Sequence, residues 1–320
     1  MSSPIPIAAL EPWFAQALIS AARTEPDGID AYLHTVGPTA SIAATGAVLR
    51  THWVAIDAHG RPRMESLAKR LAEEVVSYCI PRRKIEDAQS HLLKTGSPSR
   101  FSRLEAEAKS LFTKLENSGE GGELLLYFLL ETYLGIPQIL CKMDLKTSTN
   151  MHVHGVDGIH AQFLPNGNLA VYWGESKIYK DFNGAVKDCF DSIAPFLTDT
   201  GSGPIERDIH LVRDNIDLGN RELSLELAKY FDNDHTHSHH LEVRGACLVG
   251  FSHEQYQSPF ELDGTTVRPD LLNLMESWQE KITKRIKAKQ VESFHIEIFC
   301  VPLPSADDFR AALRSALGLT

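Results

Sequence analysis

The chain has 320 residues, of which 43% are hydrophobic and 23% charged, the composition of an ordinary globular protein. No apolar run reaches the roughly 20 residues of a membrane span, which excludes a membrane-spanning protein, and a net charge of −10 argues against a generally basic nucleic-acid coat. The five cysteines are widely spread and form no C-x-x-C pair, so we expect reduced thiols in the core of a cytoplasmic protein.

The first 110 residues combine one strand signal with several amphipathic helices. An apolar strand is expected at 49–56, and the turn His59–Pro62 follows it. Apolar residues then recur at helical spacing in three segments, 64–79, 85–93 and 103–115. We expect residues 1–110 to form an N-terminal α/β region outside a core made by residues 111–320.

The middle of the chain predicts one buried helix and three strands. Asn117 and Glu120 form a capping box at the start of a mostly apolar helix that runs to about Leu134. Strands are expected at 139–145, 153–163 and 169–179. Pro165-Asn-Gly-Asn168 is the hairpin turn between the last two of these strands.

The remaining elements complete an alternation of helices and strands. Helices are predicted at 182–197, 222–231, 271–289 and 306–317, and strands at 244–251 and 294–301. This order predicts an α/β fold in which a mixed sheet has helices on both sides.

Asp157 and the pair Glu175 and Lys177 are the most informative residues of the chain. Side chains two apart on a strand share a face, so Glu175 and Lys177 point the same way, and the hairpin brings Asp157 beside them. Two carboxylates can hold a hard divalent cation, Mg²⁺ or Mn²⁺, and the lysine can orient or deprotonate a water. Since burying an unpaired charge is costly, a cation that offsets the carboxylates favours catalysis over a structural ion pair.

Glu123 is the expected fourth member of this site. It lies one turn inside the buried helix, whereas Glu120 has a capping role available and is kept as the second choice. We expect Glu123, Asp157, Glu175 and the backbone carbonyl of Ser176 to bind the metal, with Lys177 beside the water that attacks a phosphodiester.

A histidine-rich segment, His235–His240, offers a competing site. His235, His237 and His239 alternate and can chelate Zn²⁺ on an extended segment, which leaves a zinc-dependent hydrolase as an alternative. Neither an H-E-x-x-H helix nor a cysteine pair accompanies them. We therefore favour a polar loop between a helix and a strand.

Four blocks of sequence stand out together, Gly119–Glu131, Lys142–Ser148, His154–His160 and Gly174–Asp181. In this order they resemble the HamA family, the nuclease subunits of Hachiman anti-phage systems, to which the AbpA family is related. The Asp and Glu-x-Lys pattern is similar to that of the PD-(D/E)xK nuclease superfamily.

The resemblance implies a restriction-endonuclease-like core and a Mg²⁺-dependent deoxyribonuclease that works with a HamB-like helicase. It implies DNA as substrate, and neither a membrane nor a small-molecule cofactor. The catalytic residues carry over to Asp157, Glu175 and Lys177, and the helix ligand to Glu123, with Glu120 competing. A catalytically inactive subunit that keeps the nuclease fold and binds a helicase is the other alternative.

Overall fold

A mixed seven-stranded sheet forms the centre of the computed structural model, which describes residues 12–24, 28–112, 119–145, 157–198, 204–257 and 269–319. The strand order is β1-β3-β7-β6-β5-β4, with β2 beside β3. The strands are β1 (Leu33–Thr35), β2 (Ala40–Ser41), β3 (Ala47–Val54), β4 (Gly158–Phe163), β5 (Leu169–Tyr179), β6 (Leu241–Ser252) and β7 (Ile296–Leu303).

The four central strands β3, β7, β6 and β5 run parallel, whereas β1, β2 and β4 pair antiparallel at the two sides. Parallel strands are buried on both faces and therefore carry continuous apolar runs. All of β7 and residues 169–173 of β5 are buried accordingly. The predicted mixed α/β class is confirmed.

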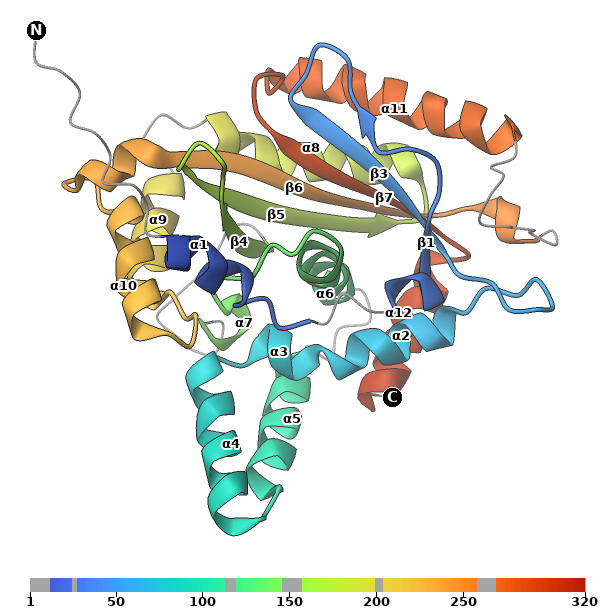
Figure 1. The fold of residues 1–320 in the computed structure, drawn as a ribbon. Coiled ribbons are helices and arrows are strands. Elements are labelled where there is room, and N and C mark those ends of the chain that lie inside the picture. Colours follow the sequence, from blue (N-terminus) through green and yellow to red (C-terminus); the bar gives the residue numbers. More distant parts are fainter. Residues whose placement is uncertain are drawn as a thin grey trace, which may run out of the picture.

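Helices cover both faces of the sheet. They are α1 (Pro12–Ile19), α2 (Met64–Glu73), α3 (Val75–Cys79), α4 (Arg82–Thr95), α5 (Ser99–Leu111), α6 (Glu120–Phe128), α7 (Lys142–Leu145), α8 (Phe182–Thr198), α9 (Pro204–Asn215), α10 (Arg221–Ala228), α11 (Pro269–Lys289) and α12 (Ala306–Leu317). Figure 1 shows α8 and α11 on one face and α6 on the other, with α4 and α5 projecting as a hairpin. Within the described segments, none of the helices has the length and apolarity needed to cross a bilayer.

Three expectations about individual elements need correction. The strand predicted at 139–145 is wrong. The start of the segment pairs with β4 through two backbone hydrogen bonds, from Ile139 N–H to Ile159 O and from Ala161 N–H to Pro137 O. The chain then enters α7. The capping box is also wrong, because the helix begins at Glu120, which makes this residue the first of the helix and not the third. Asn117 lies outside the described residues.

The third correction concerns the helix at 64–79, which is broken at Glu74 into α2 and α3. The strand predicted at 153–163 begins at Gly158 as β4, Asp157 precedes it, and residues 153–156 lie outside the described segments. The strand expected at 49–56 is β3, which pairs in parallel with β7. A strand from the first 110 residues thus belongs to the central sheet, and the domain boundary at residue 110 stays a prediction.

The five cysteines, all of which fall in described segments, are buried and form no disulfide, in agreement with the expectation of core thiols.

Candidate active site at the edge of the sheet

Strand β5 is longer than its neighbour β4, and the candidate site lies where β4 begins. Gly158 is the first residue of β4 and pairs with Gly174. Asp157, just before it, donates its N–H to Gly174 O at 2.6 Å. Among the described residues, no strand pairs with β5 on this side beyond Gly174; instead Ser176 N–H donates to Asp157 Oδ2 and Ile178 O accepts from Arg310 Nη2.

Alternate residues of β5 face two different helices. A Cβ placed on Gly122 of α6 would lie 3.0 Å from Ser176 Oγ, which places Ser176 against α6. Glu175 points to the opposite face, where its carboxylate bonds Ser192 of α8. Lys177 forms an ion pair with Glu175 on that same face, as the strand period predicts.

Asp157 is held at the strand edge by Ser176. Its Oδ2 accepts hydrogen bonds from Ser176 N–H at 2.8 Å and from Ser176 Oγ at 2.7 Å. The carboxylate is therefore fixed at the boundary between the two faces of β5, rather than directly against Glu175.

The helix glutamate that acts on this site electrostatically is Glu123. Its Oε2 accepts a hydrogen bond from the Tyr78 hydroxyl of α3 at 3.0 Å. Glu120 is the more deeply buried of the two glutamates, yet it is the charge of Glu123 that shifts the pKa of Asp157.

Burial and crowded negative charge dominate the electrostatics. Burial, followed by the charges of Glu123 and Glu175, raises the pKa of Asp157 to about 7. Burial also raises the pKa of Glu175, although Lys177 opposes the shift. Burial alone would lower the pKa of Lys177, but its hydrogen bond and charge interaction with Glu175, together with the charge of Asp157, raise it above its ordinary value.

Lys142 is a functional candidate that the motif analysis did not single out. It begins α7 and is buried, and its charge lowers the pKa values of both Asp157 and Glu175. A lysine inside the apolar run 139–143 was the available signal, since a buried ammonium requires carboxylates nearby.

The donor set fits a hard divalent cation in its chemistry. Three carboxylates, on Glu123, Asp157 and Glu175, interact with one another, and burial together with the charges of the other two raises the pKa of Asp157. In the described part of the chain, no three acidic, histidine or cysteine side chains stand close enough to chelate an ion. Binding therefore requires the carboxylates of Glu123, Asp157 and Glu175 to come closer together than they stand in this structure.

The histidine-rich segment gives no comparable site. His235 Nδ1 and His237 Nδ1 are 2.8 Å apart, but His237 Nε2 faces Glu226 Oε1 at 3.7 Å. His240 lies instead beside Asn168, at 3.4 Å. The segment forms a short 3₁₀ turn between α10 and β6, as the loop interpretation expects, and the zinc alternative gains no support.

A sequence model of the HamA family matches residues 38–317, a span that contains α6, α7, β4, β5 and every residue of the candidate site. A comparison with curated proteins finds no match.

Proposed function

This chain belongs to the HamA family, a component of Hachiman defence systems, and from that premise we propose that it is a Mg²⁺-dependent deoxyribonuclease controlled by a helicase partner. The observation that carries the proposal is the electrostatic interaction of Asp157 with Glu123 and Glu175 where β4 begins, with Lys177 paired to Glu175. The order helix, hairpin and Glu-x-Lys strand supports a PD-(D/E)xK type of core.

The three carboxylates, with the backbone carbonyl of Ser176, are the groups that would hold Mg²⁺. When bound, the ion supplies a Lewis acid that lowers the pKa of a water and neutralises charge on the scissile phosphate. Asp157 contributes a carboxylate that is already oriented by two hydrogen bonds from Ser176, which limits the freedom it loses on binding.

Lys177 acts as a cation in this proposal rather than as a base. Its pKa lies above the ordinary lysine value, so the ammonium form persists at neutral pH. An ammonium group donates hydrogen bonds to a water or to a phosphate oxygen and so orients the attack and offsets developing negative charge.

Control by a helicase is consistent with the charge of the chain. Non-specific affinity for DNA comes largely from neutralising phosphates, and a net charge of −10 opposes it. A partner that already holds DNA and presents a strand to these carboxylates would supply the missing affinity.

The test is a plasmid-degradation assay with Mg²⁺ or EDTA, with and without a HamB-like helicase. Glu175→Gln keeps the size of the side chain and removes a proposed metal ligand, so we expect cleavage to fall by about 10³-fold or more. Glu105→Gln removes an exposed carboxylate from α5 and is the matched control, with cleavage unchanged. Full cleavage by the Glu175→Gln variant, or by the unaltered chain in EDTA, refutes the proposal.

A further inference from the structure

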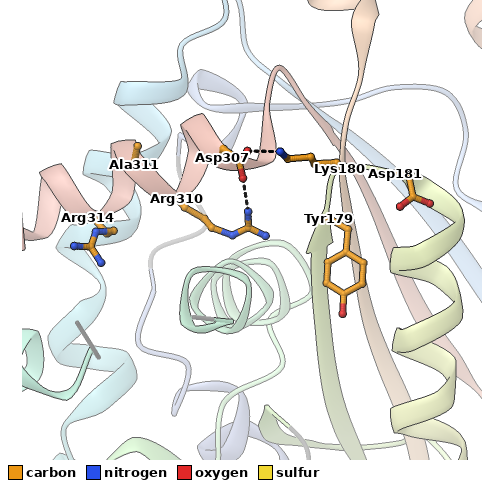
Figure 2. Close-up of a pocket in the computed structure, with 7 residues that line it drawn as sticks. All are labelled: Tyr179, Lys180, Asp181, Asp307, Arg310, Ala311 and Arg314. Carbon is orange, nitrogen blue, oxygen red and sulfur yellow. Dashed lines mark hydrogen bonds and ion pairs between the residues drawn. The ribbon is translucent and has the colours of Figure 1, made fainter. Parts of the chain in front are cut away.

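A basic cavity of about 620 Å³ opens at the end of β5, between that strand and α12. It is lined by Tyr179, Lys180 and Asp181 after the Glu-x-Lys motif, and by Asp307, Arg310 and Arg314 of α12. Figure 2 shows Lys180 and Arg310 approaching Asp307 from the strand and from the helix. Nothing in the proposed chemistry of the carboxylates uses these residues.

The larger cavity neighbours a smaller one of about 240 Å³ that borders the Glu-x-Lys motif. The smaller cavity is lined by Ser176 and Lys177 together with Tyr179 and Arg310, and the last two residues also line the larger one. The cations at the strand end therefore lie next to the part of β5 that carries the motif.

The cations of the larger cavity are held in place by the fold. Arg310 donates to the backbone oxygen of Ile178 through Nη2 and to Asp307 Oδ1 through Nη1, at 2.9 Å for the second bond. Lys180 Nζ lies 3.0 Å from Asp307 Oδ2. Asp307 thus sets a guanidinium and an ammonium side by side, and Arg314 follows one turn later on the same helix.

The lining selects for an extended anion. Three cations face two carboxylates, so the formal charge of the lining is positive. The cavity is locally positive in a chain whose net charge is −10. Arginine presents a planar fork of donors that matches phosphate oxygens, and a volume of this size accommodates more than one phosphate group.

We propose that this cavity binds backbone phosphates of the DNA strand next to the scissile bond, with Lys180, Arg310 and Arg314 as the residues that position the strand. The inference rests on the proposed nuclease function and adds to it the surface that fixes the direction of the substrate strand. Base edges are not contacted by these cations, so the contribution to binding is independent of sequence.

The test is the binding of a fluorescent single-stranded oligonucleotide to the full chain in EDTA, where no metal-dependent cleavage occurs. The double variant Lys180→Gln/Arg314→Gln is expected to bind about tenfold more weakly, and the slope of log K against log salt falls by about 1.4, or about 0.7 for each phosphate contact. Lys180 is 79% exposed, so its replacement leaves the fold intact.

Arg213→Gln is the matched control, because Arg213 also forms an ion pair with an aspartate, at 2.9 Å, but lies on α9 at the other end of the strands (Figure 1). Equal affinities and equal salt slopes for the control and the double variant overturn the inference. Arg310 lies between the other two cations (Figure 2). We expect Arg310→Gln to lose oligonucleotide binding and Arg310→Lys, which keeps the positive charge, to retain part of it. If Arg310 were purely structural, both variants would lose melting temperature equally and would not differ in binding.

Two further measurements separate this inference from the proposed function. If the double variant cleaves and binds DNA normally, the proposed phosphate site is wrong and the proposed nuclease function stands. If oligonucleotide binding depends on the three cations but the chain never cleaves DNA, the phosphate site is supported and the nuclease function is wrong. Inorganic phosphate is the competitor: if it binds with the same dependence on the three cations and displaces the oligonucleotide at equal ionic strength, the cavity is a site for free phosphate and the inference is wrong.

Discussion

Asp157 is the residue at which the charges of the candidate site meet. Burial and two neighbouring carboxylates raise its pKa, whereas Lys142 and the hydrogen bonds from Ser176 lower it. A buried carboxylate with a raised pKa lowers the stability of the folded chain at neutral pH. Such groups are typical of functional sites, where charge is arranged for a ligand rather than for stability.

This imbalance predicts an unusual dependence of stability on pH in the metal-free chain. Asp157 in the folded state keeps its proton up to about pH 7, whereas the unfolded chain loses it near the ordinary value of 3.8. Because the folded state then binds more protons, the contribution of Asp157 to the free energy of unfolding falls as pH rises from about 4 to about 7.

We therefore expect Asp157→Asn in EDTA to match the unaltered chain at pH 4 and to exceed its free energy of unfolding by about 1–3 kcal/mol at pH 8. Urea denaturation at both pH values measures the difference. A variant that is less stable than the unaltered chain at pH 8 would show that the carboxylate is compensated in the folded state.

The residues of the site were predictable to different degrees. The hairpin turn and the strand period are local signals, and they were sufficient to bring Asp157 near Glu175 and Lys177. Lys142 and Tyr78 come from α7 and α3, and their approach to the carboxylates depends on how distant segments pack. The choice of Glu123 over Glu120 depended on a helix start that the sequence pattern misplaced.

At the scale of elements, the contact between α6 and β5 sets the distance from the helix glutamate to the strand edge. Two adjacent glycines of α6 allow the close approach. Gly122 faces Ser176 and Ile178 of β5, whereas Gly121 faces Leu313 and Phe309 of α12. The helix is thus packed between the strand that carries the motif and the helix that carries Arg310.

The two glycines provide a matched test of this packing. A Cβ on Gly122 would lie 3.0 Å from Ser176 Oγ and 3.3 Å from Ser176 Cβ, both close to the strand backbone, so we expect Gly122→Ala to destabilise the chain by about 1–3 kcal/mol. DNA cleavage should fall with it, because Glu123 moves away from Asp157.

Gly121→Ala serves as the control. Its new Cβ would meet Leu313 Cδ2 at 3.0 Å, the movable end of a side chain, and alanine is the better helix former, so its free energy of unfolding should be nearly unchanged. Equal unfolding midpoints for the two variants would contradict the packing described here.

Elements with strong periodicity were predictable, and those with a tertiary origin were not. The strand now seen as β5 was expected at its observed bounds, and α8 and α12 within a residue of theirs. The segment 139–145 is apolar enough for a strand, but its pairing with β4 ends after Ile139, and Lys142 is buried. Both features depend on tertiary packing, which the local sequence pattern does not predict. Helix α9 was not anticipated, since its start follows a stretch rich in glycine and proline.

At the scale of the whole molecule, one sheet connects the first and last parts of the chain. The parallel pairing of β3 with β7 and of β7 with β6 places residues 47–54 and 296–303 in the layer that carries the candidate site. The net charge of the chain is −10, whereas the lining of the strand-end cavity holds more cations than carboxylates. The proposed function uses both properties, because the cavity would bind a strand locally and the partner would supply general affinity for DNA.

The most direct test of the central claim is a crystal structure of the chain grown with Mn²⁺, with anomalous scattering used to locate the metal. The account predicts an anomalous peak bound by the carboxylates of Asp157 and Glu175, absent from the Glu175→Gln variant grown in the same way. Full occupancy by Mn²⁺ at another place, with Asp157 still bonded only to Ser176, would contradict it.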